Sequence, residues 1–264
     1  MKILVKIRYN GANYCGFQVQ PNGITVQAVL TNAFSRLFGF PCHVTGCSRT
    51  DSGVHALGFC AAVSPANEDL LSTDWCHIPT EKLHRAVNVL LPDDISVIAA
   101  ASIPDAFHPR YNVCAKTYEY RIFNAPYRDP FCHRLAYHEP RYLDDSALAR
   151  MNEVAATFVG KHDFSGFMAS GSSIDDCTRC VFSASVTRSG EYVIYRVTAD
   201  GFLYNMVRIM AGSLVDVAFG RKKPEDICVA LNDGIRSRAG FTAPPEGLYL
   251  CDVKYDREIN WRSM

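Results

Sequence analysis

The segment from Gly46 to Ala56 holds the side chains best suited to chemistry. It reads Gly-Cys-Ser-Arg-Thr-Asp-Ser-Gly-Val-His-Ala and lies between two apolar stretches that are typical of strands. Glycines near both ends of its polar part permit tight turns and the close approach of a ligand to the backbone. Asp51 follows Arg49 and Thr50, so its carboxylate can be held ionised and aimed at a substrate. The spacing also fits a structural role, in which Asp51 closes an Asx turn and Arg49 is a surface charge.

Residues 105–141 form a second candidate region because aromatic and cationic side chains alternate there. Eight aromatic residues fall within these 37 positions, about twice the 11% density of the whole chain, and six cations are mixed with four anions. Aromatic rings stack on unpaired bases and Arg holds phosphates, so this mixture favours contact with single-stranded or loop RNA. Tyr118 and Tyr120 share one face of a predicted strand, so both fill the core or both face a cleft. Strand aromatics that fill a core account for at least half of the eight.

A third candidate is Arg208, within a stretch at 202–219 that predicts a helix. The apolar residues of this stretch form one stripe, and Arg208 projects away from it among small and apolar neighbours. An Arg in such surroundings indicates a partly buried charge that needs an anion. The alternative is an exposed Arg whose aliphatic stem lies along the helix.

The elements that must position these residues alternate between strands and helices in both halves of the chain. The first half predicts strands at 4–9, 43–47, 54–63 and 95–101 and helices at 26–38, after an N-cap at Thr25, and at 80–91. The second half predicts strands at 117–123, 181–188, 191–199 and 248–255, with helices from Asp144 or Asp145 to Gly160, at 202–219 and from Pro224. We therefore predict an α+β fold of two related strand–helix subdomains, 1–104 and 105–264, with largely antiparallel or mixed sheets around a central cleft.

Composition narrows the function classes. The chain has 264 residues, 48% hydrophobic and 20% charged, as in globular proteins, and its 27 Lys and Arg balance its 27 Asp and Glu. A neutral chain is not a basic arm that coats nucleic acid, so any polyanion must bind to a local patch. Its 19 Arg against 8 Lys favour phosphate or base contacts.

Cysteine usage and apolar runs indicate the compartment. The eleven cysteines are odd in number and scattered, the N-terminus lacks the apolar core of a signal peptide, and no run approaches the ~18 apolar residues of a membrane span. We expect a reduced, cytoplasmic protein that does not enter membranes. Cys177 and Cys180 have the spacing of half a zinc site, but no second pair follows at suitable spacing, so we expect no metal.

Taken together and in order, the motifs resemble those of the TruA family of tRNA pseudouridine synthases over nearly the whole chain. The resemblance rests on these segments: Tyr9–Gly11, Gly16–Gln20, Thr25–Gln27, Ser48–Ala56, Asn88–Ile95, Phe107–Tyr111, Lys116–Arg121, His162–Ser165, Asn205–Arg208 and Ala243–Leu250. The chain departs from the usual family pattern at Asn10, Phe17 and Ser48, and none of these departures removes a catalytic group.

The resemblance implies a reaction and a role for each candidate. It implies isomerisation of uridine at positions 38, 39 and 40 of the tRNA anticodon stem-loop by a homodimer in which one tRNA contacts both subunits. Asp51 would be the catalytic carboxylate, Arg208 its charge partner and Tyr118 the residue that packs on the target uracil. Arg49 would help to keep the carboxylate ionised. The chemistry conserves atoms, so neither a cofactor nor a metal is expected.

Further cations are candidates for phosphate contacts, which give binding strength but little sequence selectivity. They are Arg110, Lys116, Arg121, Arg128 and the run Arg221–Lys223.

Two other functions stay open at this point. The first is a non-catalytic tRNA-binding or tRNA-folding protein of the same fold. The second is a glycoside or nucleoside hydrolase that uses paired carboxylates, for which adjacent Asp pairs such as Asp93 and Asp94 are weak support, because adjacent residues on a strand point to opposite faces. A Walker loop and a Gly-x-Gly-x-x-Gly motif are both missing from the sequence, so nucleotide cofactors are not indicated.

Overall fold

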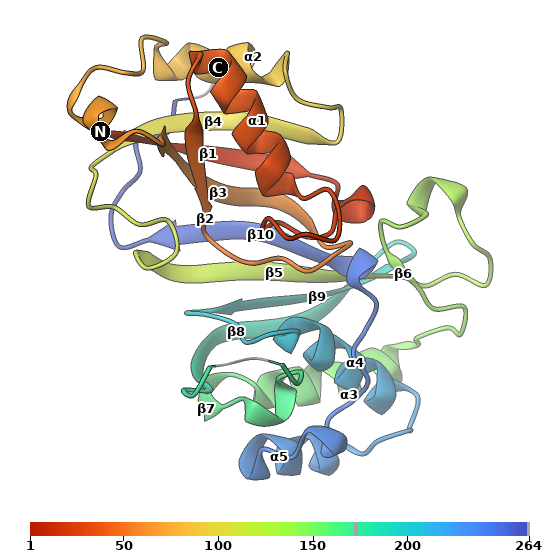
Figure 1. Cartoon of the computed structure of the whole chain (residues 1–264). Helices are drawn as coiled ribbons and strands as arrows, with labels where there is room; N and C mark the ends of the chain where they lie inside the picture. Colours follow the sequence, from red (N-terminus) through yellow and green to blue (C-terminus); the bar gives the residue numbers. More distant parts are fainter. Residues whose placement is uncertain (172–173, 263–264) are drawn as a thin grey trace. The chain divides into compact units, whose positions relative to one another are not determined.

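The structure is a computed structural model that describes residues 1–171 and 174–262, and it has the α+β architecture expected from the sequence. The chain divides into two compact units (Figure 1). The first unit contains Met1–Cys114 and the residues from Leu250 onward, and the second contains Ala115–Tyr249. The sequence-based division into 1–104 and 105–264 differs from this one. The sequence-based boundary lies at 104/105 and keeps the last strand in the second subdomain, whereas this division returns the chain to the first unit at Leu250.

The first unit is a sheet with two helices. Its strands follow the order β4 (Ile95–Ile103), β1 (Lys2–Tyr9), β3 (His55–Pro65) and β10 (Leu248–Tyr255), and β2 (Cys42–Gly46) also pairs with β3. Its helices are α1 (Val26–Phe38), next to β2, and α2 (Thr80–Asn88), next to β4. The helix predicted at 26–38 is confirmed, since Thr25 Oγ1 accepts a hydrogen bond from Ala28 N at 3.3 Å and Gly39 ends the helix at φ +79°.

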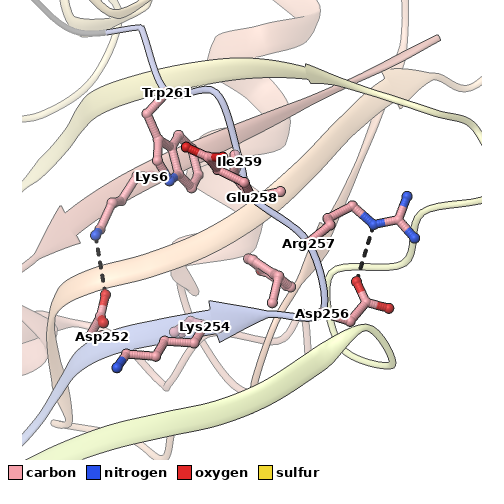
Figure 2. Close-up of a pocket in the computed structure, with 10 residues that line it drawn as sticks. Lys6, Asp252, Lys254, Asp256, Arg257, Glu258, Ile259 and Trp261 are labelled. Atoms are coloured by element: carbon pink, nitrogen blue, oxygen red, sulfur yellow. Dashed lines mark hydrogen bonds and ion pairs between the residues drawn. The ribbon is translucent and has the colours of Figure 1, made fainter.

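The chain after β10 crosses to the far edge of this sheet. Arg262 forms two backbone hydrogen bonds with Ala100 of β4, at 2.9 and 3.1 Å, and so covers an otherwise open strand edge. A cavity of about 510 Å³ lies along this segment and is lined by Lys6 and by residues between Asp252 and Trp261 (Figure 2). Its charges are largely paired, with Lys6 Nζ 3.3 Å from Asp252 Oδ1. No residue that the sequence predicts for the site lines this cavity.

The second unit is also a sheet with helices. Its strands follow the order β5 (Val113–Phe123), β9 (Tyr192–Ala199), β8 (Thr178–Ser189) and β7 (Gly160–Asp163), and β6 (Tyr137–His138) pairs in parallel with β5. Its helices are α3 (Asp145–Thr157), α4 (Met206–Ala218) and α5 (Pro224–Asp233). Helix α3 packs against β8, α4 and α5.

Helix α4 begins later than the predicted range of 202–219. Asn205 adopts φ +59°, in the left-handed region, and therefore interrupts the right-handed conformation that a helix requires. Phe202 is not helical; its ring packs edge-on against Tyr118 at 5.1 Å between centroids. The correction moves Arg208 from the interior of a helix to its first turn.

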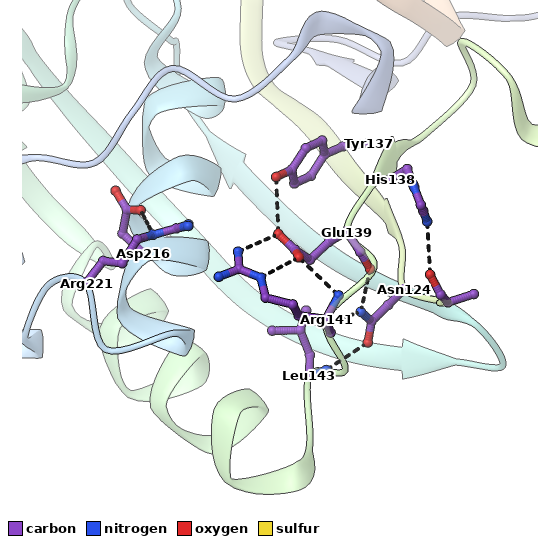
Figure 3. Close-up of polar contacts among 9 residues, drawn as sticks. Asn124, Tyr137, His138, Glu139, Arg141, Leu143, Asp216 and Arg221 are labelled. Carbon is purple, nitrogen blue, oxygen red and sulfur yellow. Dashed lines mark hydrogen bonds and ion pairs between the residues drawn. The ribbon is translucent and has the colours of Figure 1, made fainter. Parts of the chain in front are cut away.

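A buried carboxylate stabilises the chain between β6 and α3 (Figure 3). Glu139 is 3% exposed, and its two oxygens accept hydrogen bonds from Arg141 Nε at 2.9 Å and Nη2 at 3.0 Å. Tyr137 Oη donates a further bond at 3.3 Å. Burial alone would raise the pKa of Glu139, but the hydrogen bonds from Arg141 outweigh it and hold the pKa below its usual value.

We expect Glu139→Gln to lower the free energy of unfolding at pH 7 by roughly 1–3 kcal/mol, at the low end because Arg141 is half exposed. A carboxyl with a depressed folded-state pKa stabilises the fold above its unfolded pKa of about 4.3 and loses this effect as the pH falls through the folded value. The deficit of the variant should therefore shrink below pH 4. Urea unfolding at several pH values measures it, with the exposed Glu225→Gln as control. A deficit that does not change with pH would contradict this account.

Candidate active site

The loop that carries Asp51 lies at one end of the sheet of the first unit, between β2 and β3. The strand register brings together the end of β1, the start of β3 and the start of β4, because Tyr9 pairs with both Ala56 and Ile95. The loops at this end are therefore neighbours, and each is a polar segment attached to a buried strand. Asp51 is half-buried there.

The turn at Asp51 is closed by the backbone. Val54 N donates to Asp51 O at 3.2 Å, and Gly53 supplies the positive φ of +80° that this turn requires. A backbone hydrogen bond therefore closes this turn at the residue that carries the carboxylate.

Residues 9–17 support this loop from one side. Phe17 N donates to Thr50 O at 3.1 Å and Tyr9 Oη lies 2.8 Å from Thr50 Oγ1. Gly16 has φ +79°, and a Cβ added there would lie 2.5 Å from Thr50 O, so only glycine permits this approach. Residues 9–17 thus hold the backbone of the Asp51 loop in one position.

Two tyrosines in this support were missed by the sequence analysis. The first is Tyr9, whose hydroxyl lies next to Thr50 Oγ1. The second is Tyr14, whose carbonyl accepts hydrogen bonds from Gly53 N at 3.4 Å and Ser52 Oγ at 3.2 Å. Its hydroxyl donates to Asp94 Oδ1 at 2.5 Å, and burial and this bond raise its pKa. In the sequence, both tyrosines lie next to glycines of the motifs. This position does not reveal that Tyr14 contacts Asp94, which is 80 residues away.

Arg49 and Arg110 bring two cations near each other in the first unit. Burial and the charge of Arg49 lower the pKa of Arg110. His108 Nδ1 accepts hydrogen bonds from the backbone N–H of Arg110 at 3.1 Å and of Tyr111 at 3.4 Å, which fixes the turn that presents Arg110. Burial, with smaller effects of Arg110 and Lys2, lowers the pKa of His108 and favours the neutral ring that accepts these bonds. Two adjacent guanidinium groups favour an anionic ligand.

Tyr118 and Tyr120 are both buried on β5 of the second unit. Of the two arrangements that the sequence allows, both in the core or both facing a cleft, their burial fits the first. Tyr120 Oη donates to Pro244 O at 2.8 Å, which fixes it in the core. Tyr118 is 6% exposed and packs against Phe202. Burial is the main cause of a pKa for Tyr120 well above the usual value.

Arg208 is the third residue of α4 and differs from the rest of the helix. Every other residue of α4 is buried, whereas Arg208 is only partly so, and a helix buried on all sides has no solvent face along which an Arg stem could lie. Its Nε donates to Ala243 O at 2.8 Å and Nη1 donates to Asn205 Oδ1 at 2.6 Å. A cation in the first turn of a helix adds to the positive end of the helix dipole, so the two together favour an anion.

Two further candidates of the second unit, Lys116 and Arg121, lie on β5. Lys116 pairs in the register with Ala199 of β9 and is half-buried. Arg121 forms an ion pair with Glu119 at 2.9 Å, and its guanidinium lies 4.1 Å from the centre of the Tyr249 ring. Glu119 also pairs with Arg196. Arg121 therefore shares the single carboxylate of Glu119 with Arg196.

The candidate residues thus form two groups. The first unit contains Asp51, Arg49 and Arg110, and the second contains Tyr118, Lys116, Arg121 and Arg208.

Cys177 and Cys180 have the spacing of half a zinc site. Residues 1–171 and 174–262 hold no group of three or more His, Cys, Asp or Glu side chains that could hold a metal ion. No helix within the described part of the chain is long and apolar enough to cross a membrane.

Comparisons with known proteins find tRNA pseudouridine synthases that match most of the chain. A family model described as tRNA pseudouridine synthase matches residues 6–112 and 154–256. The tRNA pseudouridine synthase A of Caldicellulosiruptor saccharolyticus is 42% identical over 253 residues, which cover 96% of this chain and 99% of that protein. The protein of the same name from Geotalea uraniireducens is 40% identical over 254 residues, with 96% and 99% covered.

A solved chain from a Cbf5–Nop10–Gar1 complex is similar over 94% of this chain and 48% of that chain, at 13% identity and a TM-score of 0.37. This likeness is too weak to support an argument.

Proposed function

We propose that this chain, which belongs to the tRNA pseudouridine synthase family, isomerises uridines 38, 39 and 40 of the anticodon stem-loop with Asp51 as its catalytic carboxylate. Membership follows from the matched ranges 6–112 and 154–256 and from about 40% identity over nearly the full chain. Isomerisation of uridine in tRNA to pseudouridine is therefore its activity. The positions in the tRNA and the role of Asp51 are the proposal.

The observation that carries the role of Asp51 is the construction of its loop. A backbone turn closed by Val54 N, and bonds from Tyr9 and Phe17 to Thr50, fix the main chain that carries the half-buried Asp51. Catalytic groups act best when the protein fixes them before the substrate arrives. An ordinary surface loop would not need a tyrosine hydroxyl and a close glycine approach to support it.

The reaction requires little more than a placed carboxylate. The bond between ribose C1′ and uracil N1 breaks, the ring turns, and C1′ bonds to C5. C5 then loses its proton and N1 takes one up, so the product is an isomer of the substrate. All heavy atoms are conserved. Asp51 attacks the ribose, attacks the uracil or removes a proton, and each of these roles requires its ionised form.

The proposal also gives roles to Arg208 and Tyr118. Arg208 keeps the carboxylate ionised, because a nearby cation lowers a carboxylate pKa. Tyr118 packs on the target uracil, which must leave its stack at a cost of a few kcal/mol that base–aromatic contact of roughly 1–3 kcal/mol offsets in part. The support for Arg208 is its place as the one incompletely buried residue of α4.

Phosphate contacts and assembly complete the proposal. Arg49 and Arg110, two neighbouring cations, suit the tRNA backbone, with Lys116 and Arg121 as further contacts. We also propose a homodimer in which one tRNA contacts both subunits, since two modest basic faces joined by symmetry make a larger one from a neutral chain. Eleven free cysteines fit a reducing cytoplasm as the place of action.

We expect tritium release from tRNA transcripts labelled at uracil C5 and carrying a single uridine at position 38, 39 or 40 of the anticodon arm. Release from all three, with unchanged RNA mass, supports the proposal. Binding without release would instead identify a non-catalytic tRNA-binding protein, and a freed base would identify a hydrolase. Release only from uridines outside the anticodon arm would refute the proposed positions.

A further inference from the structure

The segment between β5 and β6 exposes an aromatic ring that the proposed reaction does not use. Phe131 is 90% exposed, the most exposed of the large hydrophobic side chains described, and Tyr127 on the same segment is 55% exposed. Figure 1 shows this segment, residues 124–136, as an excursion from the sheet of the second unit. Leaving a Phe side chain in water forgoes roughly 1.5–3 kcal/mol of burial, and this segment exposes two aromatic rings, Phe131 and Tyr127.

The position of Phe131 is fixed by its neighbours on both sides. Phe131 lies in a short 3-10 helix, Pro130–Cys132, in which Asp129 Oδ1 accepts from Phe131 N at 2.9 Å. Cys132 Sγ lies 2.6 Å from Tyr192 Oη on β9, and Leu135 N donates to Cys132 O at 2.9 Å. The ring is therefore held outward by a hydrogen-bonded turn.

The base of the segment is anchored as firmly (Figure 3). Asn124 Nδ2 donates to Glu139 O at 2.9 Å and to Arg141 O at 2.8 Å, and its Oδ1 accepts from Leu143 N at 3.0 Å. Tyr249 Oη donates to Leu135 O at 2.5 Å near the returning end. Both ends of the excursion are thus attached to the second unit, and the tip is a preformed surface.

The cations around Phe131 outnumber the free acids of the segment's surroundings. Arg128 and Arg134 lie three residues from it, on either side, and His133 lies between. Of the two acids, Asp129 caps the turn and Glu191 accepts a hydrogen bond from Tyr127 Oη. Arg134 adopts φ +58°, a conformation that costs energy for a residue other than glycine and that commonly marks functional segments. An aromatic ring flanked by cations suits an unpaired base between two phosphates.

We propose that Phe131 stacks on an unpaired base of tRNA, with Arg128 and Arg134 at the adjoining phosphates. This inference rests on the tRNA substrate of the proposed function, and it adds a binding contact that lies outside the residues assigned to the reaction. A second copy of the chain is the weaker occupant, because it would bury the guanidinium groups of Arg128 and Arg134 around the ring of each subunit.

The test compares Phe131→Ala with Phe131→Trp and with the control Phe182→Ala. Phe182 is 52% exposed on β8 of the same unit, and its neighbours Val181 and Ser183 are uncharged. Filter binding of an unmodified full-length tRNA transcript measures the affinity. We expect Phe131→Ala to bind roughly 5- to 150-fold more weakly, Phe131→Trp to bind at least as tightly as the parent, and Phe182→Ala to be unchanged.

The outcomes separate this inference from the proposed function. Unchanged affinity of Phe131→Ala overturns the stacking contact, and so does a shift of Phe131→Ala to a smaller species in sedimentation, which identifies a second copy as the occupant. If the parent protein binds tRNA but releases no tritium, the proposed function fails while the affinity comparison still decides the contact. Thermal unfolding of Phe131→Ala should match the parent, since the ring is exposed.

Discussion

Replacing Asp51 with Asn will leave tRNA bound and pseudouridine unformed. The amide keeps the shape of the side chain and the backbone turn from Val54 N to Asp51 O, but it has no negative charge and is neither a nucleophile nor a base at neutral pH. We expect turnover to fall by roughly 10⁴-fold, at the upper end of what a positioned acid–base group contributes. Tritium release under single-turnover conditions measures the chemistry, and filter binding measures the affinity separately.

An exposed aspartate of the same unit provides the control for this variant. Asp69 lies in a short 3-10 helix, Glu68–Ser72, and is exposed, so Asp69→Asn removes the same charge without touching the loop. We expect its turnover and its Tm to match those of the parent. Appreciable turnover by Asp51→Asn would remove Asp51 from the catalytic role, whereas loss of both turnover and tRNA binding would indicate a damaged loop.

The sequence predicted elements well wherever local signals decide them. Thr25 and Gly39 bound α1 through a side-chain cap and a left-handed residue, and both are visible in the sequence. The start of α4 was predicted wrongly because Phe202–Tyr204 continue the apolar pattern of the helix, while Asn205 interrupts it through a φ value that composition does not reveal. An apolar pattern indicates which residues are buried. It does not distinguish a helix from a buried loop that precedes the helix.

The candidate site shows the same division between local and long-range information. The motif around Asp51 is visible as a polar loop between two strands, and the structure confirms that position. Its support by Tyr9, Tyr14 and Gly16 depends on strand register and on contacts between distant segments. In the same way, the return of the chain from Leu250 to the first unit is a long-range pairing. Such features follow from the packed fold and have no local signature.

Arg208→Ala should lower kcat by roughly 10²- to 10³-fold with a smaller effect on tRNA affinity, as expected for one electrostatic contact at the reacting group. Arg208 is held by Ala243 O and Asn205 Oδ1 at the start of α4, so its charge has a fixed direction. Arg208→Lys keeps the charge but lacks the planar fork, and we expect it to recover only part of the rate. Steady-state tritium release separates kcat from KM.

The pH profile distinguishes a charge partner from a structural residue. In the proposal Arg208 lowers the pKa of Asp51 and the ionised carboxylate is the active form, so removing the cation raises that pKa. The acid limb of the rate profile should then move to higher pH in Arg208→Ala, and the rate deficit should grow as the pH falls. Arg238→Ala, which removes a half-exposed cation paired with Asp233 in the same unit, should leave kcat and the profile unchanged. A folded Arg208→Ala protein with the kcat and acid limb of the parent would show that Asp51 is kept ionised by another group.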